Sequence, residues 1–240
     1  MVYGGCGSTS GWRRGGSVMR GGREIKMDGF REKLVETKKA WARAGRLLTG
    51  KTAEHGIDRL PPGQRLVENW PVLDLGIQPD VPKADWRLVI DGAVENPVTW
   101  DWEAFLAQPQ VEDVSDIHCV TQWSRYDNRW NGVSTRHIAD AVKPQADVKH
   151  VLFTSYDGYT TNIELAHFLE EDCLVAHTHD GQPISREHGG PARLVVPRYY
   201  FWKSPKWVKR ITFTTEDKPG FWEVRGYHNV GDPWLEQRYS

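Results

Sequence analysis

The chain has 240 residues, of which 39% are hydrophobic and 26% are charged, so it can bury one substantial globular core. Its 31 basic and 32 acidic residues argue against a nucleic-acid-binding protein, which needs a basic excess to neutralise phosphates. No apolar run is long enough to span a membrane, and 3 widely spaced cysteines make no disulfide framework, so we expect a cytoplasmic protein.

The first 29 residues differ in composition from the rest of the chain. They are rich in Gly, Arg and Ser without apolar periodicity, which predicts disorder over residues 1–29. The paired arginines of "WRRGG" are not followed by the apolar stretch of an export signal. The Gly/Arg/Glu composition before Met27 is what translated purine-rich DNA would give, so we expect the natural start at Met27 or Met19.

An amphipathic helix is predicted over residues 30–50, ahead of a single domain over residues 55–240. Its apolar stripe comes from spacings of four and seven, and Gly50 ends it. The Pro-rich residues 59–76 should run extended across the surface. Strict alternation at Trp86, Leu88 and Ile90 predicts a half-buried strand, and "DWEAFLA" at residues 101–107 a short helix. The stripe consists of Phe30, Leu34, Trp41 and Leu48.

The second half of the chain reads mainly as strands. "VLFTS" at residues 151–155 is a buried strand, and residues 174–184 form a hairpin that turns at Asp180 and Gly181. The Thr-x-x-Glu pattern of Thr161 and Glu164 predicts a capping box that opens a helix. Further strands are expected over residues 192–197 and 206–213, before an aromatic, loop-like C-terminal segment. The fold class is therefore α+β, with mixed sheets and short helices.

Cys119 lies in the stretch "DIHCVTQWSRYDNRWNGVS" among aromatic and cationic residues. Cationic neighbours such as His118 and Arg125 can lower the pKa of a thiol, and a thiolate is the form that binds metals. A structural free cysteine fits the same stretch, because cysteine is among the most buried residue types. The stretch alone leaves both interpretations open.

A second motif, "REHGGPARLVVP", combines two glycines with a cation. Gly189 and Gly190 allow close backbone approach to a ligand, and the guanidinium of Arg193 suits a phosphate, with His188 and Lys206 as further donors. An ordinary turn followed by a solvated arginine explains the same residues.

The histidines of "HTH" offer a possible metal pair. His177 and His179 would share one face of a strand and could bind zinc, although no CxxC or HExxH pattern accompanies them. Cys6 and Cys173 are expected to be chemically inert.

Taken together, "DIHCVTQWSRYDNRWNGV", "HGGPARLVVP", "FWKSPKWVKRI" and "PGFWEVRGYHNVGDPW" closely resemble the molybdopterin-binding domain of the sulfite oxidase family, in its short prokaryotic branch. The resemblance runs from about residue 60 to the C-terminus. It implies the sulfite oxidase-type fold around molybdopterin, whose dithiolene sulfurs hold molybdenum. It also implies that Cys119 is the protein's ligand to the metal, and a soft thiolate suits such a sulfur-rich site.

The resemblance assigns the remaining site residues by motif. Tyr227 matches a tyrosine whose hydroxyl points to the substrate side of the metal. For one contact after the buried strand Thr154 or Ser155 could match, and we prefer Thr154. Arg125, Arg129 and the tryptophans would shape the mouth. The cofactor contacts are Asn69, Cys119, Thr154, His188, Arg193, Ser204 and Lys206.

Two departures argue against sulfite as the substrate. Sulfite-oxidising members have an Arg where this chain has Glu68, and a carboxylate repels an anion. Those members also take an Arg from a C-terminal dimerisation domain, and neither that domain nor a haem domain follows here.

The sequence therefore predicts a molybdopterin-dependent oxidoreductase that performs two-electron oxygen-atom transfer on a small-molecule substrate. A separate electron donor or acceptor protein would exchange single electrons with it. Two alternatives stay open, a carrier of the molybdenum cofactor without turnover and a zinc hydrolase built on Cys119 and the histidines.

Overall fold

The computed structural model describes Gly29, residues 32–40 and residues 59–240. Gly29 and residues 32–40 are helical, as the amphipathic pattern predicts, and Val35 is the residue that this helix buries. Three residues of the expected stripe, Phe30, Trp41 and Leu48, lie outside the described residues, as do residues 1–28. The domain bounds therefore stay a prediction. No helix in the described part of the chain is long and apolar enough to cross a membrane.

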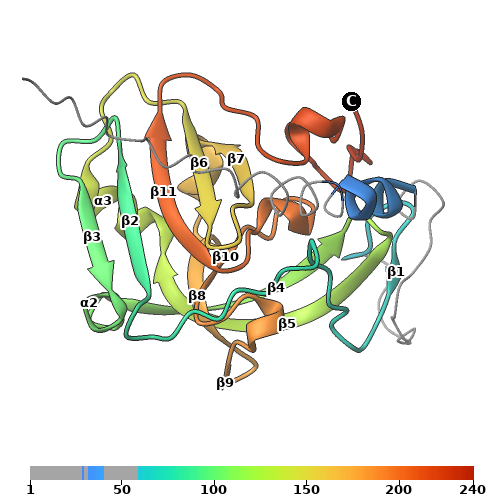
Figure 1. Ribbon diagram of the computed structural model, residues 1–240, viewed down its shortest axis with the longest axis horizontal. Coiled ribbons are helices and arrows are strands. Elements are labelled where there is room, and N and C mark those ends of the chain that lie inside the picture. The colour runs from blue at the N-terminus through green and yellow to red at the C-terminus, as the bar shows by residue number, and fades with distance from the viewer. Residues whose placement is uncertain (1–28, 30–31, 41–58) are drawn as a thin grey trace, which may run out of the picture.

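A five-stranded sheet forms one side of the molecule (Figure 1). Its strands β2 and β11 run parallel at the centre, and every other pairing is antiparallel. Alternation at Trp86, Leu88 and Ile90 correctly predicts β2, because all three side chains are fully buried. In spatial order the strands are β3 (Val98–Asp101), β2 (Arg87–Gly92), β11 (Val208–Thr214), β6 (His150–Ser155) and β7 (Thr160–Glu164).

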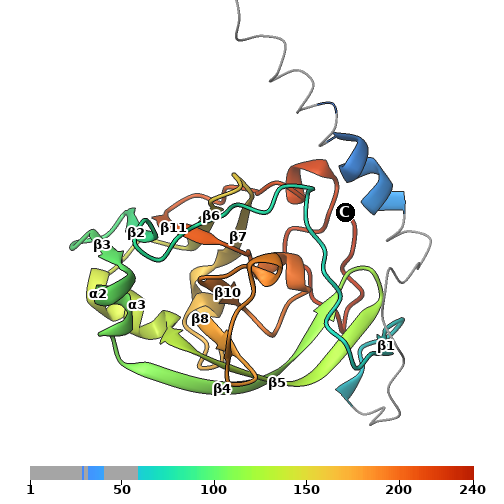
Figure 2. The same ribbon diagram turned by 60° about the horizontal axis from the view of Figure 1, so that its bottom comes forward.

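A six-stranded sheet is dominated by the long antiparallel hairpin of β4 and β5, which sweeps along one side of the molecule (Figures 1 and 2). The tip of this hairpin lies at the same end of the molecule as the helix of residues 32–40 and the C-terminus (Figure 2). The strands are β1 (Arg65–Leu66), β4 (Gln110–Cys119), β5 (Trp123–Ser134), β8 (Leu174–His179), β9 (Gln182–Pro183) and β10 (Arg193–Val195).

Short helices connect the strands. Asp101 begins the first of them, because its side chain accepts a hydrogen bond from the backbone N–H of Ala104 at 2.9 Å. The α-helices are α2 (Trp102–Leu106), α3 (Thr135–Val142) and α4 (Leu165–Phe168), and the 3-10 turns are η2 (Arg186–His188), η3 (Phe201–Lys203) and η4 (Glu223–Arg225). The α+β class is confirmed.

The six-stranded sheet stands between two hydrophobic clusters. Along β8, Val175 faces the cluster shared with the five-stranded sheet, while Leu174 and Ala176 face a second cluster that contains Cys119. Leu194 and Val195 of β10 divide in the same way. Both faces of these strands are therefore buried, which explains their nearly continuous apolar sequences.

Two local predictions have opposite outcomes. The hairpin turn at Asp180 and Gly181 is confirmed, since both residues have positive φ and His179 pairs with Gln182 across it. The capping box is wrong: residues 160–164 form strand β7, which pairs with β6, and Glu164 makes no side-chain cap at the start of α4. Pairing along an existing strand outweighs the local helix signal.

Candidate functional site

A pocket opens beside the tip of the β4–β5 hairpin. It contains about 880 Å³ of space free of atoms, the part open to solvent included. Its lining combines one thiol, three cations, two carboxylates and several aromatic rings. The thiol and charged residues are Cys119, Lys38, Arg193, Lys206, Asp74 and Asp157.

Cys119 ends strand β4 and starts the three-residue loop to β5. The loop closes with a backbone hydrogen bond from Gln122 N–H to Cys119 O at 3.0 Å, and Gln122 takes the left-handed conformation with φ 67°. The thiol lines the pocket and its residue is 6% exposed. Burial raises the pKa of Cys119, against the opposing effects of Thr121, whose hydroxyl lies 3.1 Å from Sγ, and of Lys38 and Lys206. A bound metal cation would reverse this balance and stabilise the thiolate.

The cations near Cys119 in sequence are not the cations of the pocket. Arg125 pairs with Asp180 at 2.8 Å and lies 3.1 Å from His179 Nε2. His118 turns to Ser124, 2.8 Å away, and burial lowers its pKa to about 4. Arg125 and Arg129 do not line the pocket, so the prediction that they shape its mouth is wrong.

Arg193 is the most deeply buried charge in the pocket. Its guanidinium donates to the carbonyls of His188 and Ser204, both at 2.8 Å, and lies 4.1 Å from the ring centroid of Phe201. It is fully buried, and burial lowers its pKa to about 9, so it stays charged at neutral pH. Within the described residues it has no carboxylate partner, and such an uncompensated buried charge is costly unless an anion binds beside it.

Two lysines add to this charge. Lys206 donates to the carbonyl of Glu187 at 2.6 Å, and burial together with the charge of Arg193 lowers its pKa to about 7. Lys38 reaches the pocket from the helix of residues 32–40, and burial lowers its pKa as well. The sequence pattern gave no signal for Lys38, because its helix lies far from the pocket motifs along the chain.

His188 and Ser204 support Arg193 through their backbone carbonyls. The His188 ring stacks on Trp70 with centroids 3.9 Å apart and does not line the pocket itself, whereas Trp70 does. Ser204 lines the pocket, and its hydroxyl accepts a hydrogen bond from Val196 N–H at 2.9 Å. Both residues therefore fix the cation in place.

The two glycines of this motif make room for protein atoms. A Cβ at Gly189 would lie 2.8 Å from Cβ of Lys206, and one at Gly190 would lie 2.1 Å from the carbonyl oxygen of Ile184. Gly189 therefore allows the Lys206 segment to pack closely on this motif, and Gly190 allows the segment at Ile184 to do the same.

Two predicted contacts lie away from the pocket lining. Asn69 is exposed, as is Glu68, and only the following residue, Trp70, reaches the pocket. Thr154 lies inside β6, paired with Thr160 and Arg210, and neither it nor Ser155 lines the pocket. From this region Asp157 reaches the pocket instead.

Tyr227 belongs to an aromatic wall of the pocket. Its ring lies 4.7 Å from Trp222 and 5.1 Å from Trp202, centroid to centroid, and 3% of the residue is exposed. Tyr227 and Cys119 line the same pocket, and the role of the Tyr227 hydroxyl towards the substrate stays a prediction.

A buried ion pair that sequence patterns did not indicate supports this wall. Lys203 Nζ lies 2.6 Å from Glu223 Oε1, and both side chains are almost completely buried. The same carboxylate oxygen accepts hydrogen bonds from Thr161 at 2.9 Å and from the Trp202 indole at 3.0 Å. The pair links β7, η3 and η4, the elements behind the wall.

The residues present fit molybdopterin and molybdenum. A buried guanidinium without a carboxylate partner suits a phosphate, and a thiol in the same pocket suits a sulfur-bound metal. Trp123 also lines the pocket, and its buried indole N–H has no hydrogen-bond partner among the described residues. An acceptor on a ligand would satisfy that donor.

The zinc alternative finds no support in the described part of the chain, because no metal-type cluster there includes Cys119. A β-bulge at His177 interrupts the strand, so His177 contacts Gln110 at 3.1 Å while His179 packs on Trp130, at 4.5 Å between ring centroids. The expected shared face is therefore wrong.

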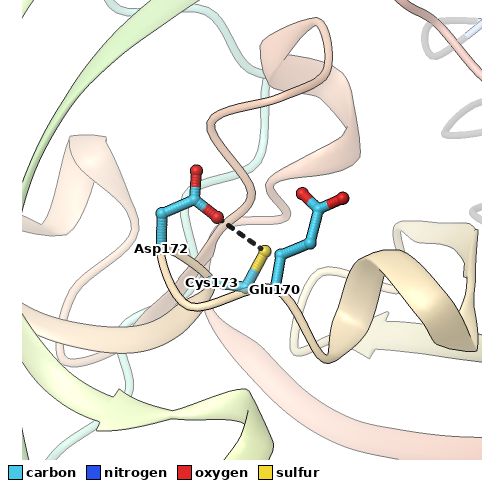
Figure 3. A group of neighbouring side chains, drawn as sticks. All are labelled: Glu170, Asp172 and Cys173. Carbon is cyan, nitrogen blue, oxygen red and sulfur yellow. Dashed lines mark hydrogen bonds between the residues drawn. The ribbon is translucent and has the colours of Figure 1, made fainter.

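Cys173 lies in a separate cluster with Glu170 and Asp172 (Figure 3), where the three ligand atoms lie within 4.8 Å of one another. Glu170 already contacts His167 at 2.8 Å and Arg198 at 3.4 Å. Burial raises the pKa of the Cys173 thiol, which donates to the carbonyl of His167 at 3.3 Å. These partners account for the cluster without a metal.

Fold and site together define an α+β domain whose pocket brings one thiol and three cations together. A model of the oxidoreductase molybdopterin-binding domain matches residues 75–222, and the chain belongs to this family. The predicted sulfite oxidase-type resemblance is thereby confirmed, as is the cofactor, molybdopterin with molybdenum. The chain is an oxidoreductase of this family.

Relatives differ in how much of their length the chain covers. It is 44% identical over 196 residues to the uncharacterized oxidoreductase YuiH of Bacillus subtilis, covering 80% of this chain and 98% of YuiH. It is 28% identical over 156 residues to the catalytic subunit of the protein-methionine-sulfoxide reductase MsrP of Campylobacter jejuni, covering 58% of this chain and 52% of MsrP. The sulfane dehydrogenase SoxCD of Paracoccus pantotrophus shares the fold, with a TM-score of 0.55 at 20% identity over 62% of this chain and 42% of that chain.

Proposed function

We propose that this oxidoreductase carries out two-electron oxygen-atom transfer on a small-molecule substrate and exchanges electrons with a separate redox protein. The observation that carries the proposal is the shared pocket of the Cys119 thiol and the uncompensated Arg193 guanidinium. The name of the MsrP relative, a catalytic subunit, supports a partner protein.

Arg193 and Lys206 would hold the phosphate of the cofactor by charge-assisted hydrogen bonds. The backbone carbonyls of His188 and Ser204 keep Arg193 in place by accepting hydrogen bonds from its guanidinium N–H groups. Cys119 would coordinate molybdenum through its thiolate sulfur. When bound, the metal would supply the two-electron redox chemistry of oxygen-atom transfer. Asn69 and Thr154 remain predicted cofactor contacts that would require a local rearrangement, since neither lines the pocket.

Tyr227 would bind the substrate oxygen through its hydroxyl on the Cys119 side of the pocket. Together with Trp202 and Trp222 it forms a wall that excludes water from the reacting centre, which strengthens electrostatic interactions there. We expect Tyr227→Phe to lower kcat while leaving the molybdenum content unchanged.

Sulfite is not the substrate that we propose. Where sulfite-oxidising members have an Arg this chain has Glu68, so that cation is missing. Glu68 itself is exposed outside the pocket, so the expected repulsion of sulfite by its carboxylate is not supported. A cytoplasmic location stays part of the proposal.

Metal and pterin analysis of protein made in a molybdenum-competent host tests the proposed function. We expect about one molybdenum and one molybdopterin per chain, because a protein has few cofactor pockets. We also expect redox activity, and Cys119→Ala should abolish it. Cys173→Ala is the matched control, because that thiol lies outside the pocket. Molybdenum without redox activity towards any donor would favour a cofactor carrier, zinc without molybdenum would favour the hydrolase, and a fully active Cys119→Ala would remove the ligand role.

A further inference from the structure

The helix of residues 32–40 contributes to the pocket although it lies outside the matched family domain of residues 75–222. Val35 anchors it: this side chain is 3% exposed and belongs to the same cluster as Val67, Leu75 and Cys119. Lys38 follows three residues later on the same face of the helix, which directs it into the pocket.

We propose that Lys38 is an oxyanion-binding residue of this pocket, placed at the end occupied by Cys119. The inference rests on the proposed function, because it takes Cys119 as the metal ligand and therefore its end of the pocket as the place where the substrate reacts. The ligand chemistry is a small, multiply charged oxyanion group, carried either by a free substrate or by the cofactor itself.

The charges around Lys38 support this assignment. Its ammonium group acts electrostatically on the thiol of Cys119, on Asp74 and on Lys206, so it lies among the charged groups of the pocket. Among the described residues no side-chain hydrogen bond or ion pair engages the ammonium group of Lys38. The carboxylate of Asp74 is already bound to Gly76 N–H and Gln78, at 2.8 and 2.7 Å. The Lys38 side chain is partly buried in the pocket wall, and its ammonium group is not paired within the described residues, so it is available to an anionic ligand.

The exposed face of the same helix provides the control. Lys33 has the same charge and lies on the solvent side. Its removal changes the net charge of the chain as the removal of Lys38 does, so the two variants separate a local contact from a general electrostatic effect.

The test measures inorganic sulfate binding by titration calorimetry at low ionic strength, and cofactor content, for full-length wild type, Lys38→Gln and Lys33→Gln. If Lys38 binds a free oxyanion, the loaded wild type binds sulfate, Lys38→Gln weakens this binding roughly tenfold or more, and both hold equal cofactor. If Lys38 binds the cofactor's own oxyanion, loaded wild type takes up no sulfate and Lys38→Gln loses cofactor. Lys33→Gln should match wild type in both cases.

Two further variants keep the result interpretable. Lys38→Arg should restore binding, and Val35→Asp should reproduce the loss, because it releases the helix without removing a pocket charge. Sulfate binding by the cofactor-free chain distinguishes a failure of the proposed function from a failure of this inference. If the protein never binds molybdenum, the proposed function is wrong. If its sulfate binding nevertheless depends on Lys38, the inference about Lys38 still holds. Equal sulfate binding and equal cofactor content in wild type and Lys38→Gln would overturn it.

Discussion

Lys203 and Arg193 are both fully buried cations, but their surroundings differ. Lys203 lies 2.6 Å from the carboxylate of Glu223 and also bonds to Asn162, so its charge is balanced inside the protein. Arg193 contacts only carbonyls and ring faces among the described residues. In the first arrangement the charge is compensated within the fold, whereas the second leaves a charge that an anion can compensate.

Breaking the balanced pair should have the largest effect on stability. Glu223→Gln leaves Lys203 buried without a counter-charge, so we expect the free energy of unfolding to fall by roughly 3–5 kcal/mol. Denaturant unfolding of the cofactor-free chain measures this. Glu216→Gln, on an exposed side chain, is the control, and the double change Lys203→Met with Glu223→Met should recover much of the loss. If Glu223→Gln is as stable as wild type, the distinction between the two cations is wrong.

Arg193→Gln should show the opposite profile. The cofactor-free chain should lose only about 1–3 kcal/mol, from the two carbonyls left without donors, while cofactor affinity falls roughly tenfold to a hundredfold. Unfolding and cofactor retention on dialysis measure the two effects. Arg198→Gln, whose side chain is half exposed, controls for charge. A large stability loss with unchanged retention would contradict the account.

Lys206 should give the site a pH dependence with opposite signs for stability and binding. In the folded, cofactor-free chain its pKa is about 7, below 10.5 in the unfolded chain, so between these values the unfolded chain binds more protons. The free energy of unfolding of the cofactor-free chain should therefore rise from pH 7 to pH 10, compared with that of the Lys206→Met variant. Sulfate affinity needs the ammonium form and should fall several-fold as pH rises through about 7. Lys209→Gln, an exposed lysine, should keep both trends.

Ser204→Ala should give the smallest effect. It removes the acceptor of the Val196 N–H, which costs about 1 kcal/mol of stability. Because the Ser204 carbonyl still holds Arg193, cofactor content should stay close to that of wild type. A loss of cofactor as large as in Arg193→Gln would mean that the Ser204 hydroxyl contacts the cofactor directly.

Local patterns predicted the elements whose periodicity or turn residues determine them, such as β2 and the turn at Asp180 and Gly181. They failed at Thr161 and Glu164, because pairing of β7 with β6 overrides a local helix signal. The motifs around Cys119 and Arg193 left their roles open, and only the family resemblance implied that both contact one cofactor; the structure places both in one pocket. Lys38 and the Lys203–Glu223 pair were missed, since they join segments far apart in the chain and leave no local pattern.

X-ray absorption at the molybdenum edge of wild type and Cys119→Ser tests the central assignment most directly. If the Cys119 thiolate is the protein's ligand, the wild-type spectrum contains one sulfur neighbour of molybdenum more than that of the variant. Identical sulfur coordination in the two proteins, at equal molybdenum content, would contradict the account.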